Sequence, residues 1–229
     1  MPATLYDDEE LLPLSGALRA QFREHFPDVG DAPGSIRVAT DHDRLWRLAT
    51  LAVHFGTIDD RWTAGDPVTV LYPSELSPEA LRSAMGAIEP DAGRPLLIAL
   101  DHPNWTFLAP WSFISRCEHL WVAAPPDFSW VVCHWYGEFV QFSRLRFSHI
   151  TQLAFVRRFP TPNGPLVEKP QYLIRYTTGD PWLVGPLTDP DERKSYDRVF
   201  EFLSARSGRP IEQIDVLPDD LVRKTQRPR

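Results

Sequence analysis

Asp101 and His102 are the adjacent residues of this sequence best suited to chemistry. They directly follow a continuous apolar run over 95–100. A carboxylate beside an imidazole can act as an acid–base pair or bind one metal ion, and catalytic groups are common where a strand of a sheet ends. The alternative is a structural role, in which Asp101 forms a turn and His102 lies half-buried against Trp105.

Cys133 and His134 form a second pair, within an apolar stretch over 129–136. Side chains alternate along a strand, so these neighbours point to opposite faces and cannot form a nucleophile–base pair with each other. Cys133 is therefore expected to be a buried, unreactive thiol. His134 could join Asp101 and His102 if their strands are neighbours, and these three are the candidate catalytic residues of a small-molecule-binding or hydrolytic enzyme.

Aromatic residues are concentrated around these groups. The segment from Trp105 to Phe147 holds 12 of the 27 aromatic residues and five of the eight tryptophans. Each large ring buries about 150–250 Å², so such a segment can form a core, line a pocket, or do both. The predicted pocket, or binding surface, includes Trp105, Trp111, Trp130 and Trp135.

No motif in the sequence indicates a cofactor. Asp41-His42-Asp43 has the residue types of a metal site, but it also suits the start of a helix, where acidic groups cap free amides and favour the positive end of the dipole. The GxxxxGK[ST], GxGxxG, GxSxG, HExxH and CxxC patterns do not occur. We therefore expect no metal site and no cofactor.

Charge is distributed unevenly along the chain. The formal net charge is −7, with −6 within residues 1–43 and +5 within 144–175. An acidic chain with only three lysines is an unpromising nucleic-acid binder. Arg144 and Arg146 would share one face of a strand with Val140 and Phe142, and an exposed arginine–aromatic surface is typical of protein interfaces. Equally, the arginine stems could lie over buried rings in an ordinary sheet.

These observations favour a non-enzymatic protein-interaction module over an enzyme. Its partner would be a charged protein, and an inhibitor- or immunity-type role against a basic partner is one form of this hypothesis. The chain lacks an apolar run of about 18 residues that could span a membrane, and its two cysteines are too few for a disulfide framework. A cytoplasmic location is therefore expected, and the oligomeric state stays open.

The periodicity of apolar residues predicts an α+β fold. Amphipathic helices are expected over 11–26 and 41–55, then a β-α-β unit formed by a strand at 68–72, a helix beginning after Ser77 and a strand over 95–100. The second half should be a mainly antiparallel meander closed by an amphipathic helix that begins at Asp189-Pro190 and ends at Gly208. The predicted strands of the meander are Leu120–Ala123, Ser129–Tyr136, Phe139–Phe147, Ile150–Phe159, Gln171–Thr177 and Trp182–Leu187.

Residues 103–110, which are rich in proline, are the expected soft boundary within the chain. This gives a helical and β-α-β part over 1–103 and a β-meander part with the last helix over 104–229, which together would form one compact unit.

Overall fold

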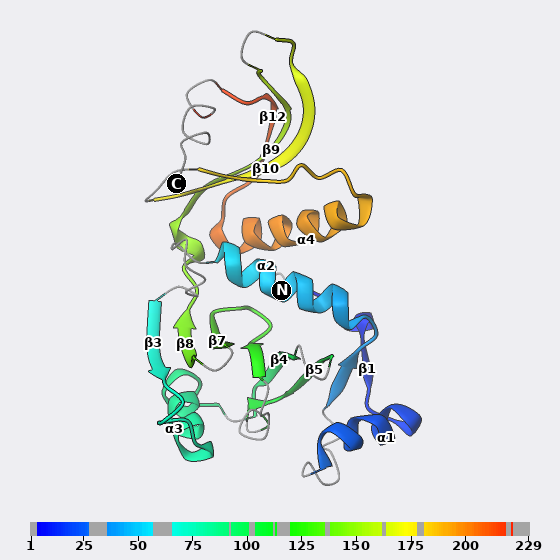
Figure 1. Ribbon diagram of the computed structural model, residues 1–229, viewed down its shortest axis with the longest axis vertical. Helices are drawn as coiled ribbons and strands as arrows, with labels where there is room; N and C mark the ends of the chain where they lie inside the picture. Colours follow the sequence, from blue (N-terminus) through cyan, green and yellow to red (C-terminus); the bar gives the residue numbers. More distant parts are fainter. Residues whose placement is uncertain are drawn as a thin grey trace. The chain divides into compact units, whose positions relative to one another are not determined.

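The computed structural model describes residues 4–27, 36–56, 66–91, 93–100, 104–111, 113, 120–135, 138–161, 164–177, 181–218 and 221. It has four helices and twelve strands in two mainly antiparallel sheets, which confirms the predicted α+β class (Figure 1). The contacts divide the chain into two units, Thr4–Leu145 and Arg146–Arg229. The division follows residue 145, whereas the sequence placed its soft boundary near 103, which lies between two paired strands of one sheet.

The first unit is built on an eight-stranded sheet. Its elements are listed here in chain order: the 3-10 turn η1 (Asp8–Glu10), β1 (Leu11–Pro13), α1 (Gly16–His25), β2 (Arg37–Ala39), α2 (His42–Phe55), β3 (Asp66–Leu71), α3 (Pro78–Ile88), β4 (Pro95–Leu100), β5 (Trp105–Pro110), β6 (Leu120–Ala124), β7 (Trp130–Trp135) and β8 (Phe139–Arg144). The strand order is β1-β2-β5-β4-β6-β7-β8-β3, and every neighbouring pair is antiparallel. The crossover from β3 through α3 to β4 therefore joins strands that run in the same direction but have three strands between them.

Helices cover both faces of this sheet. Phe22 of α1, Phe26 directly after it and Met85 of α3 share one core with alternate residues of the strands, among them Ile98 and Phe107. Helix α2 packs on β4 and β5 from the opposite face, where the imidazole Nδ1 of His42 lies 2.8 Å from the hydroxyl of buried Thr106. Strands covered on both sides read as continuous apolar runs, which is why 95–100 shows no alternation.

Helices α2 and α3 begin at the capping residues that the sequence predicted. The Asp41 carboxylate accepts the backbone N–H of Arg44 at 3.0 Å, and the Ser77 hydroxyl accepts that of Ala80 at 3.1 Å. Each side chain satisfies an amide that has no partner within its own helix, and Pro78 occupies a first-turn position where no amide is needed. The prediction of a helix start at Asp41-His42-Asp43 is confirmed.

Two expectations for this unit were wrong. The helix expected from Leu11 begins only at Gly16, because Leu11–Pro13 forms β1 and pairs with β2. The segment Trp105–Pro110, interpreted as a boundary, is the inner strand β5, which pairs with both β4 and β2. In each case pairing with a strand distant in sequence outweighed the local signal.

The second unit has a four-stranded sheet in the order β11-β10-β9-β12. Its elements are the 3-10 turn η4 (Phe147–His149), β9 (Ile150–Phe159), β10 (Val167–Tyr176), β11 (Trp182–Val184), α4 (Pro190–Ser207) and β12 (Ile211–Val216). Helix α4 packs on β9 and β12. The Tyr172 ring stacks on Phe200 at 4.0 Å, and its hydroxyl donates to Asp197 at 2.7 Å. Leu217 and Leu221 pack with Ala154 and Val156 in a second, small core.

Helix α4 has the expected ends. The Asp189 carboxylate accepts the backbone N–H groups of Asp191 and Glu192, and Gly208 ends the helix in the left-handed conformation with φ of 70°. Strand β12 follows directly and was not predicted. Within the described residues, no helix of either unit is both long enough and apolar enough to cross a membrane.

Candidate functional site

The predicted catalytic residues are only partly described. Asp101 and His102 lie outside the described residues, whereas His134 is partly buried near the end of β7. Ala99, Val122 and Cys133 form one row across β4, β6 and β7, and the pairing of β4 with β6 shifts register immediately after it, where Leu100 pairs with Leu120. Neighbouring strands are about 4.8 Å apart, which places the end of β4 about 10 Å from His134, with one strand between them.

The tryptophans do not gather at one place. Trp105 and Trp111 pack against the core that α1 and α3 cover, and Trp130 is buried in it, while the Trp135 side chain lies outside the described part. Trp105 and Trp130 are on outer strands of the group β5-β4-β6-β7 and are offset by four residues along them. At about 3.4 Å per residue and 4.8 Å per strand they are about 20 Å apart, too far to line one small-ligand pocket.

Arg144 and Arg146 do not share a strand face. Strand β8 ends at Arg144, which is exposed, and Arg146 follows in the second unit as the residue that precedes η4. Val140 and Phe142, which could have formed an exposed surface with the arginines or the buried part of an ordinary sheet, are buried in the core under α1 and α3. The predicted strand over 139–147 was therefore too long, and its apolar face is internal.

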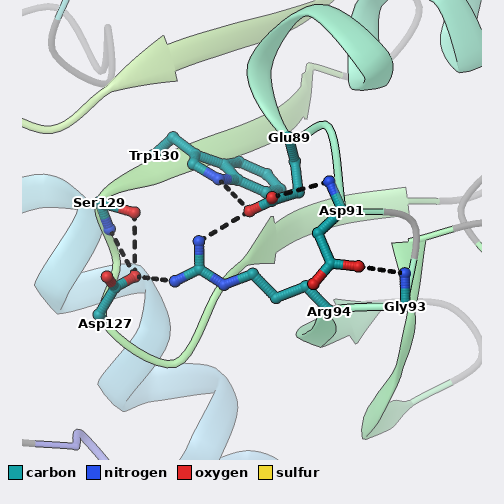
Figure 2. A network of polar contacts seen from close by, with 7 residues as sticks. All are labelled: Glu89, Asp91, Gly93, Arg94, Asp127, Ser129 and Trp130. Atoms are coloured by element: carbon teal, nitrogen blue, oxygen red, sulfur yellow. Dashed lines mark hydrogen bonds and ion pairs between the residues drawn. The ribbon is translucent and has the colours of Figure 1, made fainter.

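A polar network that the sequence did not indicate lies where α3 joins β4 (Figure 2). Glu89 follows the last turn of α3 and its side chain is only 7% exposed. Its carboxylate accepts the Arg94 Nη1 hydrogen at 2.7 Å and the Trp130 indole N–H at 3.4 Å. The other guanidinium nitrogen of Arg94, Nη2, lies 3.0 Å from the Asp127 carboxylate.

Backbone groups complete this network. The Asp127 carboxylate accepts both the backbone N–H and the hydroxyl of Ser129, at 3.2 and 2.9 Å. The second oxygen of Glu89 accepts the Asp91 N–H at 3.2 Å, and the Asp91 carboxylate accepts the Gly93 N–H at 3.0 Å. Figure 2 shows Arg94 lying between the two carboxylates. The arrangement fastens the α3–β4 connection to the β6–β7 turn.

Electrostatics keep Arg94 charged. Partial burial lowers the pKa of its guanidinium, but the hydrogen bonds and charges of Glu89 and Asp127 outweigh that effect and leave the pKa above its ordinary value. Both carboxylates are engaged by donors, and Arg94 is shared between them. This arrangement suits a structural clamp between the α3–β4 connection and the β6–β7 turn.

Cys133 has the environment of an inert thiol. It is 4% exposed, and burial raises the pKa of its sulfhydryl from 9.0 to about 12. A thiol reacts as the thiolate, so this side chain is unreactive at neutral pH. Within the described part of the chain, no three His, Cys, Asp or Glu side chains lie close enough together to bind a metal ion.

Acidic side chains of β12 pair with polar and basic side chains of the segment 144–175. The Arg158 guanidinium on β9 pairs with Asp215, and the Gln152 amide donates to Glu212 at 2.6 Å. The hydrogen bond and charge of Asp215 raise the pKa of Arg158, and those of Arg158 lower the pKa of Asp215. Because β12 brings acidic side chains alongside β9, the basic segment is partly neutralised within its own sheet.

The acidic amino-terminal segment is likewise paired in part. The Arg37 guanidinium lies 3.0 Å from the Asp8 carboxylate and donates to the Leu11 carbonyl at 2.8 Å, while Arg44 pairs with Glu10. Exposed ion pairs of this type contribute at most about 1 kcal/mol each. They nevertheless tie η1 to β2 and to the first turn of α2.

Comparison with known proteins identified no related protein. No protein-family model matches the chain, and neither the curated proteins nor the solved structures contain a match.

Proposed function

We propose that this chain is a protein-interaction module whose eight-stranded unit binds a positively charged protein. One observation carries the proposal, the separation of charge between the units. Residues 4–145 hold 20 acidic and 10 basic side chains, a net charge of −10, whereas residues 146–229 hold 11 acidic and 14 basic side chains, a net charge of +3. Complementary charge accelerates encounter and selects the partner more than it adds affinity.

An inhibitor- or immunity-type role against a basic protein is the form of interaction that this charge suits best. Such a role needs a folded surface of one sign and no reactive group. The buried Cys133 thiol and the hydrogen-bonded Glu89–Arg94–Asp127 network fit that requirement.

The test is capture of a partner by the full-length chain at low and high salt. A stoichiometric protein partner that is released as the salt concentration rises is expected, because salt screens exposed charges. Two matched variants locate the charge: Glu9→Gln with Glu24→Gln in the first unit, and Glu168→Gln with Glu201→Gln in the second. All four side chains are exposed. The first pair should weaken capture and the second should not; a partner retained equally by both variants and at high salt contradicts the proposal.

A second candidate is a small-molecule-binding or hydrolytic enzyme that uses Asp101, His102 and His134. The observation that favours it is the sheet order, in which β6 alone separates the end of β4 from His134 on β7, a spacing of about 10 Å. The test is a panel of chromogenic ester and phosphate substrates assayed with the wild type and with His134→Ala, His102→Ala and Asp101→Asn. Hydrolysis that all three substitutions abolish would favour this candidate, and an inactive wild type would remove it.

A further inference from the structure

A small exposed aromatic surface lies at one edge of the eight-stranded sheet. Five large hydrophobic side chains are exposed among the described residues, and two of them, Tyr72 at 56% and Leu76 at 38%, are four residues apart. Tyr72 directly follows β3, the strand at the end of the sheet order. Exposed apolar side chains that are grouped at one place are typical of interaction sites, whereas single ones are ordinary.

Strand pairing and a tight turn hold this surface in place. Leu71 pairs with Val140, so the next residue on each strand brings Tyr72 beside Phe139, with ring centroids 6.5 Å apart in an edge-to-face arrangement. The Glu75 N–H donates to the Tyr72 carbonyl at 2.8 Å, and the Tyr72 N–H donates to the Glu75 carboxylate at 3.1 Å. Tyr72 is thus pre-positioned, and little conformational freedom would be lost on binding.

Two acidic residues lie close in sequence to the two rings. Glu75 is in the turn after Tyr72 and Glu138 directly precedes Phe139, and both carboxylate side chains are exposed. The face of an aromatic ring attracts cations, and a guanidinium can stack on tyrosine while it pairs with a carboxylate. We call this surface the aromatic edge; it consists of Tyr72, Leu76 and Phe139 with Glu75 and Glu138. Its chemistry matches a cationic side chain flanked by apolar atoms.

The other exposed apolar side chains match this chemistry less well. Leu166 and Val167 belong to the second unit, which is net positive, and the nearby Arg157 and Lys169 are exposed. Leu12 lies on the short strand β1, where Arg37 already binds Asp8 and the Leu11 carbonyl. Of the three places, only the aromatic edge combines exposed rings with acidic side chains on the acidic unit.

We propose that the aromatic edge is where this chain docks an arginine- or lysine-bearing segment of its partner. The inference rests on the proposed function and adds to it the surface and the chemical class of the bound segment. Tyr72 supplies the ring over which the cation lies, and Glu138 and Glu75 supply the opposite charge.

The test uses the full-length chain and a short synthetic peptide of alternating arginine and glycine, with a citrulline–glycine peptide as the uncharged control. At low salt, the arginine peptide is expected to bind and the citrulline peptide is not. Tyr72→Ala should weaken binding of the arginine peptide about two- to fivefold, and Tyr72→Phe should retain most of it. Glu138→Gln should also weaken it, whereas Asp43→Asn, which removes one exposed carboxylate elsewhere on the unit, and Leu166→Ala should not.

Equal binding of the two peptides, or equal affinity of the wild type and Tyr72→Ala, overturns the aromatic edge as the docking surface. The proposed function fails separately. A partner that still binds Tyr72→Ala and is still released by salt leaves the interaction role intact and removes only this surface, whereas insensitivity of capture to salt and to the charge variants removes the interaction role itself. Circular dichroism of Tyr72→Ala, a change at an exposed side chain, verifies that the fold is retained.

Discussion

The Glu89 carboxylate accepts a hydrogen bond from Arg94 at 2.7 Å, although Glu89 is almost completely buried and Arg94 is one-third exposed. The pair spans the connection between α3 and β4, and Asp127 binds the same guanidinium from the β6–β7 turn. A charge at this depth depends on its partners, because its desolvation is costly. The effect of removing one partner is therefore larger than the small net contribution of an exposed ion pair.

Arg94→Met keeps most of the side-chain stem but leaves Glu89 buried without its cation. We expect the free energy of unfolding of the first unit to fall by about 3 kcal/mol, measured by urea denaturation followed through tryptophan fluorescence. Glu89→Gln should cost less, because an amide can still accept from Trp130. The double variant should be more stable than the sum of the two losses predicts; strict additivity would show that the two side chains are not coupled.

Cys133 should resist alkylation in the folded protein. In a Cys117→Ser background, iodoacetamide should modify Cys133 only after denaturant is added, because burial raises the pKa of the thiol to about 12 and keeps it protonated. Mass spectrometry before and after unfolding measures the modification. Rapid labelling of the native chain would contradict the buried position on β7.

Raised pKa values also predict a loss of stability in alkali. Burial raises the pKa of Cys133 and those of the hydroxyls of Tyr6, Tyr172 and Tyr176 above their values in the unfolded chain. The native state binds these protons more tightly than the unfolded chain does. Their contribution to the free energy of unfolding is therefore complete below about pH 9 and is lost as the pH rises towards the pKa values of the groups in the folded protein. Denaturation midpoints measured from neutral to alkaline pH should therefore fall above about pH 9, and a flat profile would contradict the burial of these groups.

Two glycines should respond to alanine in opposite directions. Gly208 ends α4 with φ of 70°, a backbone conformation that disfavours any side chain, whereas Gly86 lies within α3 and a Cβ there meets nothing within 4 Å. Gly208→Ala should lower the free energy of unfolding by about 1 kcal/mol, and Gly86→Ala should raise it by about 0.5–1 kcal/mol. The same measurement on both variants makes each a control for the other.

The segment after β12 should be essential to the second unit. Leu217 is 1% exposed and packs with Ala154 and Val156, so Leu217→Ala should cost about 2–4 kcal/mol through the lost contacts and the cavity. Leu166→Ala, at a side chain that is 44% exposed, should change stability by less than about 0.5 kcal/mol. Chemical denaturation of both variants tests the comparison, and equal stability would show that Leu217 does not pack on Ala154 and Val156.

Local chemistry made some elements predictable from the sequence. Ser77-Pro78 and Asp189-Pro190 combine a capping side chain with a proline that needs no amide partner, and both helices begin there. These signals depend on neighbouring residues only. They hold whatever the rest of the chain does, which is why the helix starts agreed with the structure.

Elements that depend on distant residues were missed. Strand β12 has no clear alternation and exists through parallel pairing with β9, and β5 was hidden by its flanking prolines. Glu89, Arg94 and Asp127 lie on two separate connections, and no spacing rule brings them together. The alternation Trp105, Phe107, Ala109 was the one local indication that 105–110 is a strand.

The position of β3 has a consequence for how the chain folds during synthesis. Leu71 pairs with Val140, 69 positions later, and β8 is the only strand that β3 pairs with in the described part of the chain. A growing chain must therefore expose β3 without its neighbour until β8 has left the ribosome. Such distant pairings slow folding and leave unpaired edges open to aggregation, so the last strand to join the eight-stranded sheet is one of the first to be made.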